Sequence, residues 1–331
     1  MRYLGSKTLL TQQIFELVGP YERGAVFCDP FGGIGTVGSY MKQQGFRVIS
    51  GDLLQFAHCF QKALIQMNEI PSFRNVIEAE HIYVGMEKYL NSLIADTGWL
   101  VEEYSNKRKF FTIDNAKHIQ GCINAIWDWR LENRIDEDEY AFLIASLINS
   151  TDKVANTAGT YYAYLKEYGR KARRPFCFRF LQPYKGDFSC DCVLEDANSL
   201  VSRQNCQILY LDPPYNERDY AGYYHLPETI ARGNVPNATG KSGISVRSGE
   251  RSAYITKARV MAAFSDLIDR CHCDMILFHY TDQGLLKEEF VRAILSEKGK
   301  IEEHYFNCKG YRTSKSDQTM HSQHHVYKVV L

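Results

Sequence analysis

Apolar residues in the first part of the chain alternate between helical and strand spacing. They recur every three to four positions over 6–18, which predicts a helix. Short apolar runs at 25–28 and 46–50 predict strands, and helical spacing follows each of them, at 35–44 and 53–67. Strands and helices that alternate in this order indicate a parallel sheet with right-handed crossovers.

The middle of the chain has a different pattern. From about 80 to 165 the apolar residues keep helical spacing and no convincing strand interrupts them. Asp114 and Asp136 stand where helix N-caps are expected. A strand is expected at 176–181, at the border of this region. The pattern therefore predicts a mainly helical segment inserted into an α/β protein.

Strand and helix spacing alternates again in the last third of the chain. This predicts strands at 208–211, 275–279, 301–307 and 325–330, and helices at 224–232, 256–270 and 288–298. Residues 233–255 are rich in Gly, Ser, Pro and Asn without a period, so a long loop is expected there. The fold class expected from the whole pattern is α/β, with a Rossmann-like sheet and a helical insertion.

Composition narrows the class of protein. The 331 residues are 45% hydrophobic and 24% charged, as in a soluble globular protein. No apolar run approaches the roughly 20 residues that cross a membrane, and the first ten residues lack the apolar core of a secretion signal. Ten cysteines then indicate reduced thiols in a cytoplasm. The pairs Cys190/Cys192 and Cys271/Cys273 are too closely spaced for a usual zinc site, so no metal is expected.

The formal net charge is zero, but basic residues are clustered. Residues 166–185 hold seven Lys/Arg and one acid, and residues 232–259 hold six Lys/Arg and one acid. Phosphate binding requires a local basic surface and not a basic protein. Two such segments favour contact with nucleic acid, although each alone would suit an ordinary solvated loop.

A glycine-rich turn follows the first predicted strand. Gly33 to Gly38 fit the pattern G-x-G-x-x-G, and Asp52 ends the next strand, which by itself permits an NAD site. The carboxylate of Asp29 at the strand end would repel the pyrophosphate of NAD. For two charges 4 Å apart, this repulsion costs about 1–4 kcal/mol. S-adenosylmethionine (SAM) has no phosphate and carries a positive sulfonium, so an acid at this position favours SAM.

Five short motifs occur in a fixed order. They are RYLGSK at 2–7, DPFGGIGTVG at 29–38, GDL at 51–53, EDA at 195–197 and LDPPYN at 211–216. Together they resemble the alpha-group SAM-dependent DNA adenine-N6 methyltransferases, including those of restriction-modification systems. The similarity covers nearly the whole chain.

The resemblance implies roles for individual residues. Tyr3 and Lys7 match the aromatic residue and the lysine that close over the cofactor, and Tyr3 stands where tryptophan is common. The SAM-binding loop is matched by Asp29, Pro30, Phe31, Gly33 and Gly35. Asp52 matches the acid that binds the ribose, and Asp196 the acid beside the adenine ring of SAM. The catalytic tetrad is matched by Asp212, Pro213, Pro214 and Tyr215, with Asp212 also close to the cofactor.

The tetrad suits methylation of an exocyclic amine. The adenine N6 lone pair is delocalised into the ring, so the nitrogen is a poor nucleophile. The Asp212 carboxylate and the Pro213 carbonyl can accept its two hydrogens and stabilise the positive charge that develops. Pro213 and Pro214 carry no N–H that would compete. Tyr215 can stack on a base rotated out of the duplex.

The sequence therefore predicts a site-specific enzyme that methylates adenine N6 in double-stranded DNA by base flipping and in-line displacement. Residues 1–68 and 186–331 are expected to form the catalytic domain, and 69–185 the target-recognition domain. Contacts with DNA phosphates are expected from Arg173, Arg174, Arg247 and Arg251, and Arg218 is expected to bind DNA near the target pocket. Asn156, Thr157 and Tyr161 are candidates for DNA contact or, equally, for structural roles. A cytoplasmic monomer is expected, with a possible separate restriction endonuclease as partner.

Three alternatives remain open at the level of sequence. The same tetrad can serve an N4-cytosine methyltransferase. The glycine pattern permits an NAD-dependent dehydrogenase. A DNA-binding relative without catalysis is the third, although the intact tetrad opposes it.

Overall fold

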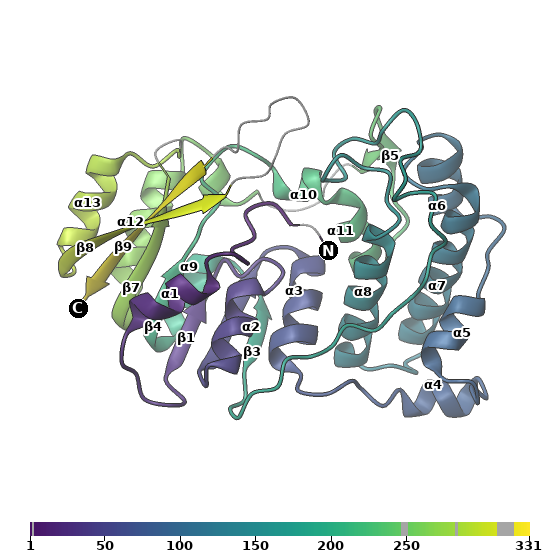
Figure 1. Cartoon of the computed structure of the whole chain (residues 1–331), viewed down its shortest axis with the longest axis horizontal. Helices are drawn as coiled ribbons and strands as arrows, with labels where there is room; N and C mark the ends of the chain where they lie inside the picture. The colour runs from purple at the N-terminus through teal and green to yellow at the C-terminus, as the bar shows by residue number, and fades with distance from the viewer. Residues whose placement is uncertain (2, 246–250, 282–283, 310–320) are drawn as a thin grey trace. The chain divides into compact units, whose positions relative to one another are not determined.

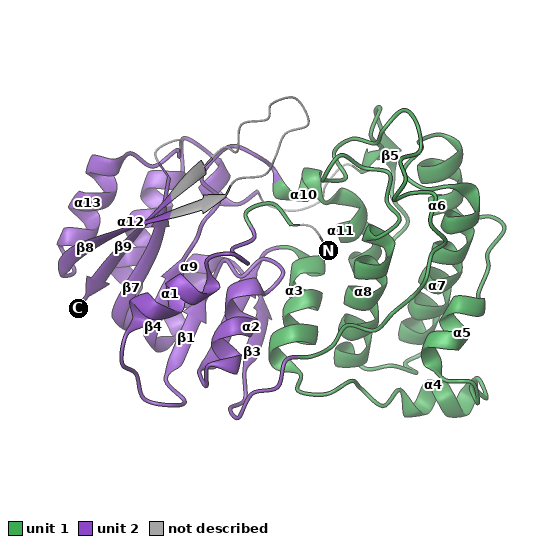
Figure 2. Ribbon diagram, in the orientation of Figure 1, with its two compact units in different colours: residues 1–5, 54–183, 220–249 green, residues 6–53, 184–219, 250–331 purple. Residues whose placement is uncertain are grey.

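The protein is described here by a computed structural model that covers residues 1, 3–245, 251–281, 284–309 and 321–331 (Figure 1). The chain forms two compact units (Figure 2). Unit 1 comprises Met1–Gly5, Leu54–Pro183 and Tyr220–Gly249, and unit 2 comprises Ser6–Leu53, Tyr184–Asp219 and Glu250–Leu331. Each unit is therefore built from segments that are distant in sequence.

Unit 2 contains a seven-stranded mixed sheet with the order β3-β2-β1-β4-β7-β9-β8. Its strands are β1 (Val26–Asp29), β2 (Arg47–Asp52), β3 (Asp191–Leu194), β4 (Asn205–Leu211), β7 (His272–Tyr280), β8 (Lys300–Lys309) and β9 (His321–Val330). All neighbouring pairs from β3 to β7 are parallel, whereas β9 is antiparallel to both β7 and β8. The prediction of an α/β protein is confirmed, with a mixed sheet.

Helices cover both faces of this sheet. Successive strand residues point to opposite sides, and apolar side chains on each side are buried against helices. α1 (Thr11–Val18) and α2 (Thr36–Gln43) lie on one face, where Phe27 and Phe46 are buried (Figure 1). The other face packs Cys28 and Ile49 against α9 (Ala197–Arg203), α12 (Val260–Arg270) and α13 (Glu288–Ser296). These two layers hold the strand ends in fixed positions.

The strand order reverses direction between β1 and β4. The chain leaves β1 for β2 on one side, and leaves β4 for β7 on the other. Ligands in open α/β sheets bind outside the carboxyl ends of the strands at such a point. Asp29 is the last residue of β1, and Asp212 follows the last residue of β4. The topology therefore places two carboxylates at the expected ligand position.

Unit 1 is mainly helical. Its elements are α3 (Gln55–Gln61), η1 (Lys62–Gln66), α4 (Arg74–Ala79), α5 (Met86–Ser92), α6 (Trp99–Val101), η2 (Glu102–Asn106), α7 (Ile113–Leu131), α8 (Glu137–Asp152), α10 (Tyr220–Tyr223), α11 (His225–Arg232), β5 (Ala238–Thr239) and β6 (Ile244–Ser245). Asp136 caps α8 through a capping box, as the sequence predicts. The cap of α7 is Thr112, whose hydroxyl accepts from the Asn115 N–H at 3.3 Å, and Asp114 lies in the first turn instead.

Three sequence predictions differ from the structure. Residues 176–181 form no strand, and the short strand β3 has no counterpart among the predicted elements. The segment 233–255 is not a plain loop, since it contains the β5–β6 hairpin and the 3-10 helix η3 (Ala253–Ile255). These elements have four residues or fewer, too short for a hydrophobic period to develop.

The two units do not follow the expected division at 68/69 and 185/186. Residues 54–68 and 220–249 belong to the helical unit by their contacts, and the first five residues do as well. Which segments recognise the target DNA stays a prediction. In the part of the chain that the structure describes, no helix is both long and apolar enough to cross a membrane.

Candidate active site

An ion pair between Lys7 and Asp212 lies at the carboxyl end of β4. The Lys7 Nζ is 2.5 Å from the Asp212 Oδ2, and the two side chains are 5% and 17% exposed. The second carboxylate oxygen of Asp212, Oδ1, is buried and has no hydrogen-bond partner among the described residues. Asp212 is therefore anchored through one oxygen and has an acceptor available at the other.

Asp29 is a second buried carboxylate, at the end of β1. Its side chain is 2% exposed, and its Oδ1 also has no hydrogen-bond partner among the described residues. Burial raises the pKa of Asp29 to about 8, and the negative charges of Asp212 and Asp52 add to this effect, while a hydrogen bond from the Phe31 N–H opposes it. A cationic ligand at this position would relieve the burial and the repulsion.

The glycine loop after β1 is closed by backbone hydrogen bonds and by Asp52. The Gly33 N–H donates to the Asp52 Oδ2 at 3.0 Å, and the Gly32 N–H to the Gly51 carbonyl at 2.9 Å. Gly33 and Gly35 have φ angles of 52° and 79°, in the left-handed region that glycine adopts without strain. The loop and the end of β2 thus form one rigid turn at the start of α2.

Aromatic and polar side chains flank this turn. The ring of Tyr254, in η3, lies edge-on to Phe31 with 4.8 Å between the ring centroids. The Tyr254 hydroxyl donates to the Asn198 Oδ1 at 2.8 Å. Asp196 caps α9 by accepting from the Asn198 N–H at 3.0 Å. Phe31 and Asp196, both singled out by the sequence, are therefore linked through Tyr254 and Asn198, which were not.

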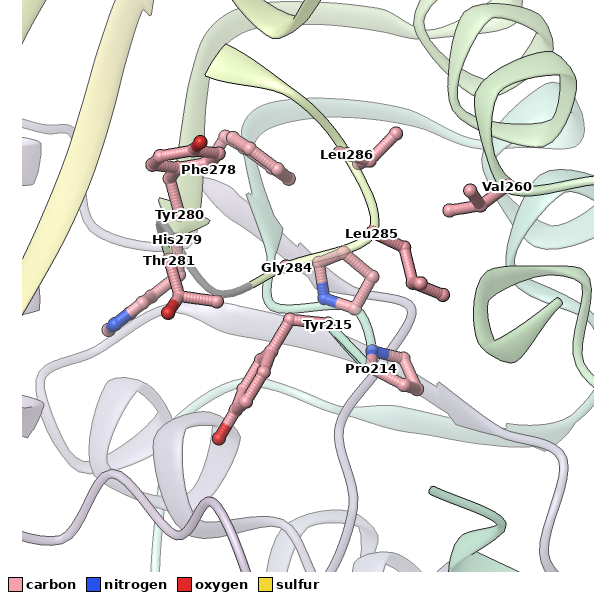
Figure 3. Close-up of a pocket in the computed structure, with 11 residues that line it drawn as sticks. Pro214, Tyr215, Val260, Phe278, His279, Tyr280, Thr281, Gly284, Leu285 and Leu286 are labelled. Carbon is pink, nitrogen blue, oxygen red and sulfur yellow. The ribbon is translucent and has the colours of Figure 1, made fainter. Parts of the chain in front are cut away.

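Three tetrad residues, Pro213, Pro214 and Tyr215, line a small pocket at the ends of β4 and β7 (Figure 3). Its walls include Pro213, Pro214, Tyr215, Phe278, His279, Tyr280 and Thr281. The Tyr215 carbonyl accepts from the Leu285 N–H at 2.8 Å, which fixes the tetrad backbone to the segment after β7. The fixed φ of the two prolines adds to this rigidity.

The other candidate residues are distributed over both units. Tyr3 belongs to unit 1, where it stacks on Tyr224 with centroids 5.1 Å apart. The side chains of Arg173, Arg174, Arg218 and Arg251 are exposed, and Arg247 lies outside the described residues. Exposure makes these arginines available to phosphates but does not test the prediction.

Asn156 and Tyr161 have structural roles. Asn156 is buried, its side-chain amide donates to the Lys109 and Leu165 carbonyls, and its Oδ1 accepts from the Gly169 N–H. Tyr161 is 1% exposed. Because both side chains are enclosed by protein, the structural alternative is favoured, while contact with DNA stays untested.

Several polar groups near the two carboxylates lacked a sequence signal. The Tyr210 hydroxyl, two residues before Asp212 on β4, is buried without a hydrogen-bond partner among the described residues. Burial and the charges of Asp212 and Asp29 raise the pKa of Tyr210. His279 lies at the end of β7.

Within the described residues no group of three or more His, Cys, Asp or Glu is arranged to hold a metal ion.

Comparison with known families gives a match over most of the chain. Residues 3–301 match the family described as D12 class N6 adenine-specific DNA methyltransferase. The matched segment includes both carboxylates, the glycine loop and the tetrad. The resemblance given under Sequence analysis is thereby confirmed, and a dehydrogenase is excluded by the same match.

Characterised proteins give the same result. The chain is 35% identical to the type II methyltransferase M.FokI of Planomicrobium okeanokoites, over 96% of the chain and 50% of the relative. It is 34% identical to the modification methylase StsI of Streptococcus sanguinis, over 90% and 46%. It is 32% identical to M.NlaIII of Neisseria lactamica, over 98% and 95%. The chain thus spans about half the length of the first two relatives and nearly all of the third.

Proposed function

Because the chain belongs to the D12 class of N6 adenine-specific DNA methyltransferases, we propose that it transfers a methyl group from SAM to N6 of adenine in double-stranded DNA. The observation that supports this most directly is the state of Asp212. One oxygen is held by Lys7 at 2.5 Å, and the other is buried with no partner among the described residues. An unmet acceptor at the end of a central strand suits a substrate N–H group.

The residues around the glycine loop fit SAM, which supplies a methyl group on a positively charged sulfur. Asp29 provides a buried carboxylate with no ion-pair partner among the described residues, and it would hold the positive end of the cofactor. Phe31 and Tyr254 offer an aromatic corner for the adenosine, and Asp52 and Asp196 offer carboxylates for its hydroxyl and amino groups. No residue of this set is suited to binding a pyrophosphate.

Asp212 and Pro213 would act on the target amine. The Lys7 ammonium holds one oxygen of Asp212 in place, which leaves Oδ1 available as an acceptor for the amine. As the amine nitrogen becomes positive, a carboxylate already in place stabilises that charge without reorganisation. Pro213 lacks an N–H, and its carbonyl would accept the second hydrogen of the amine. Tyr215 would stack on the extruded base.

The exposed arginines would contact DNA phosphates. Arg173 and Arg174 lie in the segment before β3, and Arg218 and Arg251 in unit 2. Phosphate contacts position a protein on DNA, whereas base contacts set the recognised sequence. We propose that base contacts come from 69–185. Arg247 is kept in this proposal from the sequence alone.

We also propose a cellular compartment, an oligomeric state and a relation to an endonuclease for this protein. The nine described cysteines are all free thiols, which suits a reducing cytoplasm. We propose a monomer that modifies DNA independently of a cognate restriction endonuclease. Methylation of the same site in cells with and without such an endonuclease tests this arrangement.

Expression in a host without DNA methylation tests the proposed function. Host DNA should then contain N6-methyladenine at one short sequence, and single-molecule mapping should locate it. N4-methylcytosine at that sequence would support the cytosine alternative, and unmodified DNA despite tight SAM binding would support a relative without catalysis.

A further inference from the structure

The histidine pair His279–His324 adjoins the pocket that Pro213 and Tyr215 line, and the chemistry proposed above leaves both histidines without a role. His279 is the last residue but one of β7 and lines the same pocket as Tyr215 (Figure 3). His324 lies on β9, two residues before Val326, the residue paired with His279, so both side chains point to one face of the sheet. The His279 Nε2 is 2.9 Å from the His324 Nδ1.

His279 lines one pocket with Pro213, the residue that follows Asp212, so the histidine pair lies near the ion pair. The charges of Lys7 and Asp212 both act on His324, and those of Lys7, His324 and His325 act on His279. His279 is 7% exposed, whereas His324 is half-buried. His324 therefore has a route to solvent that His279 lacks.

We propose that His324 carries away, by way of Asp212, the proton that the methylated amine must lose, and that His279 positions the His324 ring for this task. This inference rests on the function proposed above and adds two residues to it. His324 would act as a proton acceptor, and His279 as a positioning residue.

The proton balance is simple. A methylated exocyclic amine retains both hydrogens and is a cation. One N–H bond breaks as an O–H bond forms on Asp212; that O–H bond then breaks as an N–H bond forms on the His324 imidazole. The imidazolium releases the proton to water or buffer, so the positive charge leaves with it. No electron transfer is involved, and no proton passes through Lys7.

The pair has properties suited to this step. Burial lowers the pKa of His279 well below its usual range, and the neighbouring positive groups act in the same direction, so His279 stays neutral and serves as a fixed hydrogen-bond partner. Burial and Lys7 also lower the pKa of His324, while Asp212 opposes them. A proton that reaches His324 is therefore released readily.

His325 does not share this arrangement. It lies on the opposite face of β9, stacked on Tyr305 with centroids 4.3 Å apart, and its Nε2 is 3.4 Å from the Glu303 carboxylate. The two adjacent histidines of β9 thus have different surroundings, and it is His324 whose ring lies within hydrogen-bond distance of His279.

Chemical rescue tests the proposal. Steady-state transfer to a DNA duplex is measured for the wild type, His324→Ala, His279→Ala and His272→Gln, with and without added imidazole. His272 is exposed at the other end of β7, which makes it a matched control. We expect His324→Ala to lower kcat by about a hundredfold, with SAM affinity unchanged, and imidazole to restore part of the rate. His279→Ala should lose less, and His272→Gln nothing. A wild-type rate in His324→Ala, or a loss that imidazole leaves unchanged, would overturn the proposal.

A second measurement does not depend on activity. Histidine titration followed by NMR in the wild type and in Asp212→Asn reports the coupling between Asp212 and His324. Because Asp212 raises the pKa of His324, its removal should lower the His324 midpoint further, and an unchanged midpoint overturns the relay. If the wild type methylates no adenine, the proposed function fails, whereas the midpoint shift still reports on the pair itself.

Discussion

β1 and β4 both lead into an aspartate, but the charged surroundings of the two carboxylates differ. At the end of β4, Asp212 has a lysine at 2.5 Å and keeps one oxygen for a ligand. At the end of β1, Asp29 is 2% exposed, has no ion pair among the described residues and has a pKa raised to about 8. A carboxylate paired in advance can act on a neutral amine. A carboxylate without a counter-charge is suited to bind a cation.

This difference assigns separate tasks to the two acids. Asp212 would serve the transfer step, and Asp29 the binding of a positively charged cofactor. The two are coupled, since the charge of Asp212 is one cause of the raised pKa of Asp29. Substitution of either carboxylate, or of a residue beside it, should therefore affect binding and transfer to different extents.

Asp212→Asn should have the largest effect. The amide keeps the shape of the side chain but loses the charge that stabilises the developing cation, so we expect transfer to fall about a thousandfold. Single-turnover transfer at saturating SAM measures this. Asp191→Asn, at an exposed position of β3, serves as the control. A rate within tenfold of wild type would contradict the role given to Asp212.

Lys7→Met should come next. Removal of the ammonium leaves Asp212 mostly buried and unpaired, at a cost of about 3 kcal/mol to the free energy of unfolding. The carboxylate also loses the contact that fixes its orientation, so transfer should fall as well. Chemical denaturation and single-turnover transfer measure the two effects, with the exposed Lys300→Met as control. A wild-type rate of transfer would show that Lys7 does not position Asp212.

Asp29→Asn should weaken SAM binding about tenfold and stabilise the free protein. The folded pKa of Asp29 lies above its unfolded value, so its contribution to stability is present below pH 4 and lost as the pH rises toward about 8. The amide does not ionise and avoids that loss. Thermal unfolding at pH 8 should therefore give a higher Tm for the variant. A lower Tm would mean that Asp29 is already stabilised as an anion in the free protein.

The affinity for SAM should depend on pH through the same group. Below a pKa of about 8 the free protein holds Asp29 protonated, and a cationic ligand must displace that proton. Affinity should rise by up to about tenfold per pH unit between pH 6 and 7.5. Calorimetry in buffers of different ionisation enthalpy detects the released proton. In Asp29→Asn both the pH dependence and the proton release should disappear.

Tyr254→Phe should have the smallest effect. The lost hydroxyl leaves the Asn198 Oδ1 without its 2.8 Å donor, which costs about 1–2 kcal/mol. Thermal unfolding measures this loss. SAM affinity should change less than in Asp29→Asn, since the ring that meets Phe31 is retained. A larger effect on SAM affinity than on stability would assign the hydroxyl to the cofactor.

Prediction from the sequence was most successful where the chain has a strong local pattern. The parallel strands around Asp29 and Asp212 follow from apolar runs that end in acids, and the pair of long C-terminal strands was also predicted. The four-residue β3 and the β5–β6 hairpin were not predicted, because segments of this length develop no measurable period.

The site was predicted as individual residues but not as pairs. The motifs identified Lys7 and Asp212 separately, and nothing in their spacing indicated that they form an ion pair across 205 positions. The bonds from Tyr254 to Asn198 and from His279 to His324 also join distant segments. Such contacts depend on the register of the sheet and on helix packing, which a linear pattern does not encode.

Titration of SAM into Asp212→Ala is the most direct test of the division between the two carboxylates. If Asp29 provides the binding charge and Asp212 the transfer chemistry, calorimetry will give a Kd within a few fold of the wild-type value, although this variant transfers almost no methyl groups. A loss of SAM binding that matches the loss of transfer would contradict the account, because both tasks would then depend on Asp212.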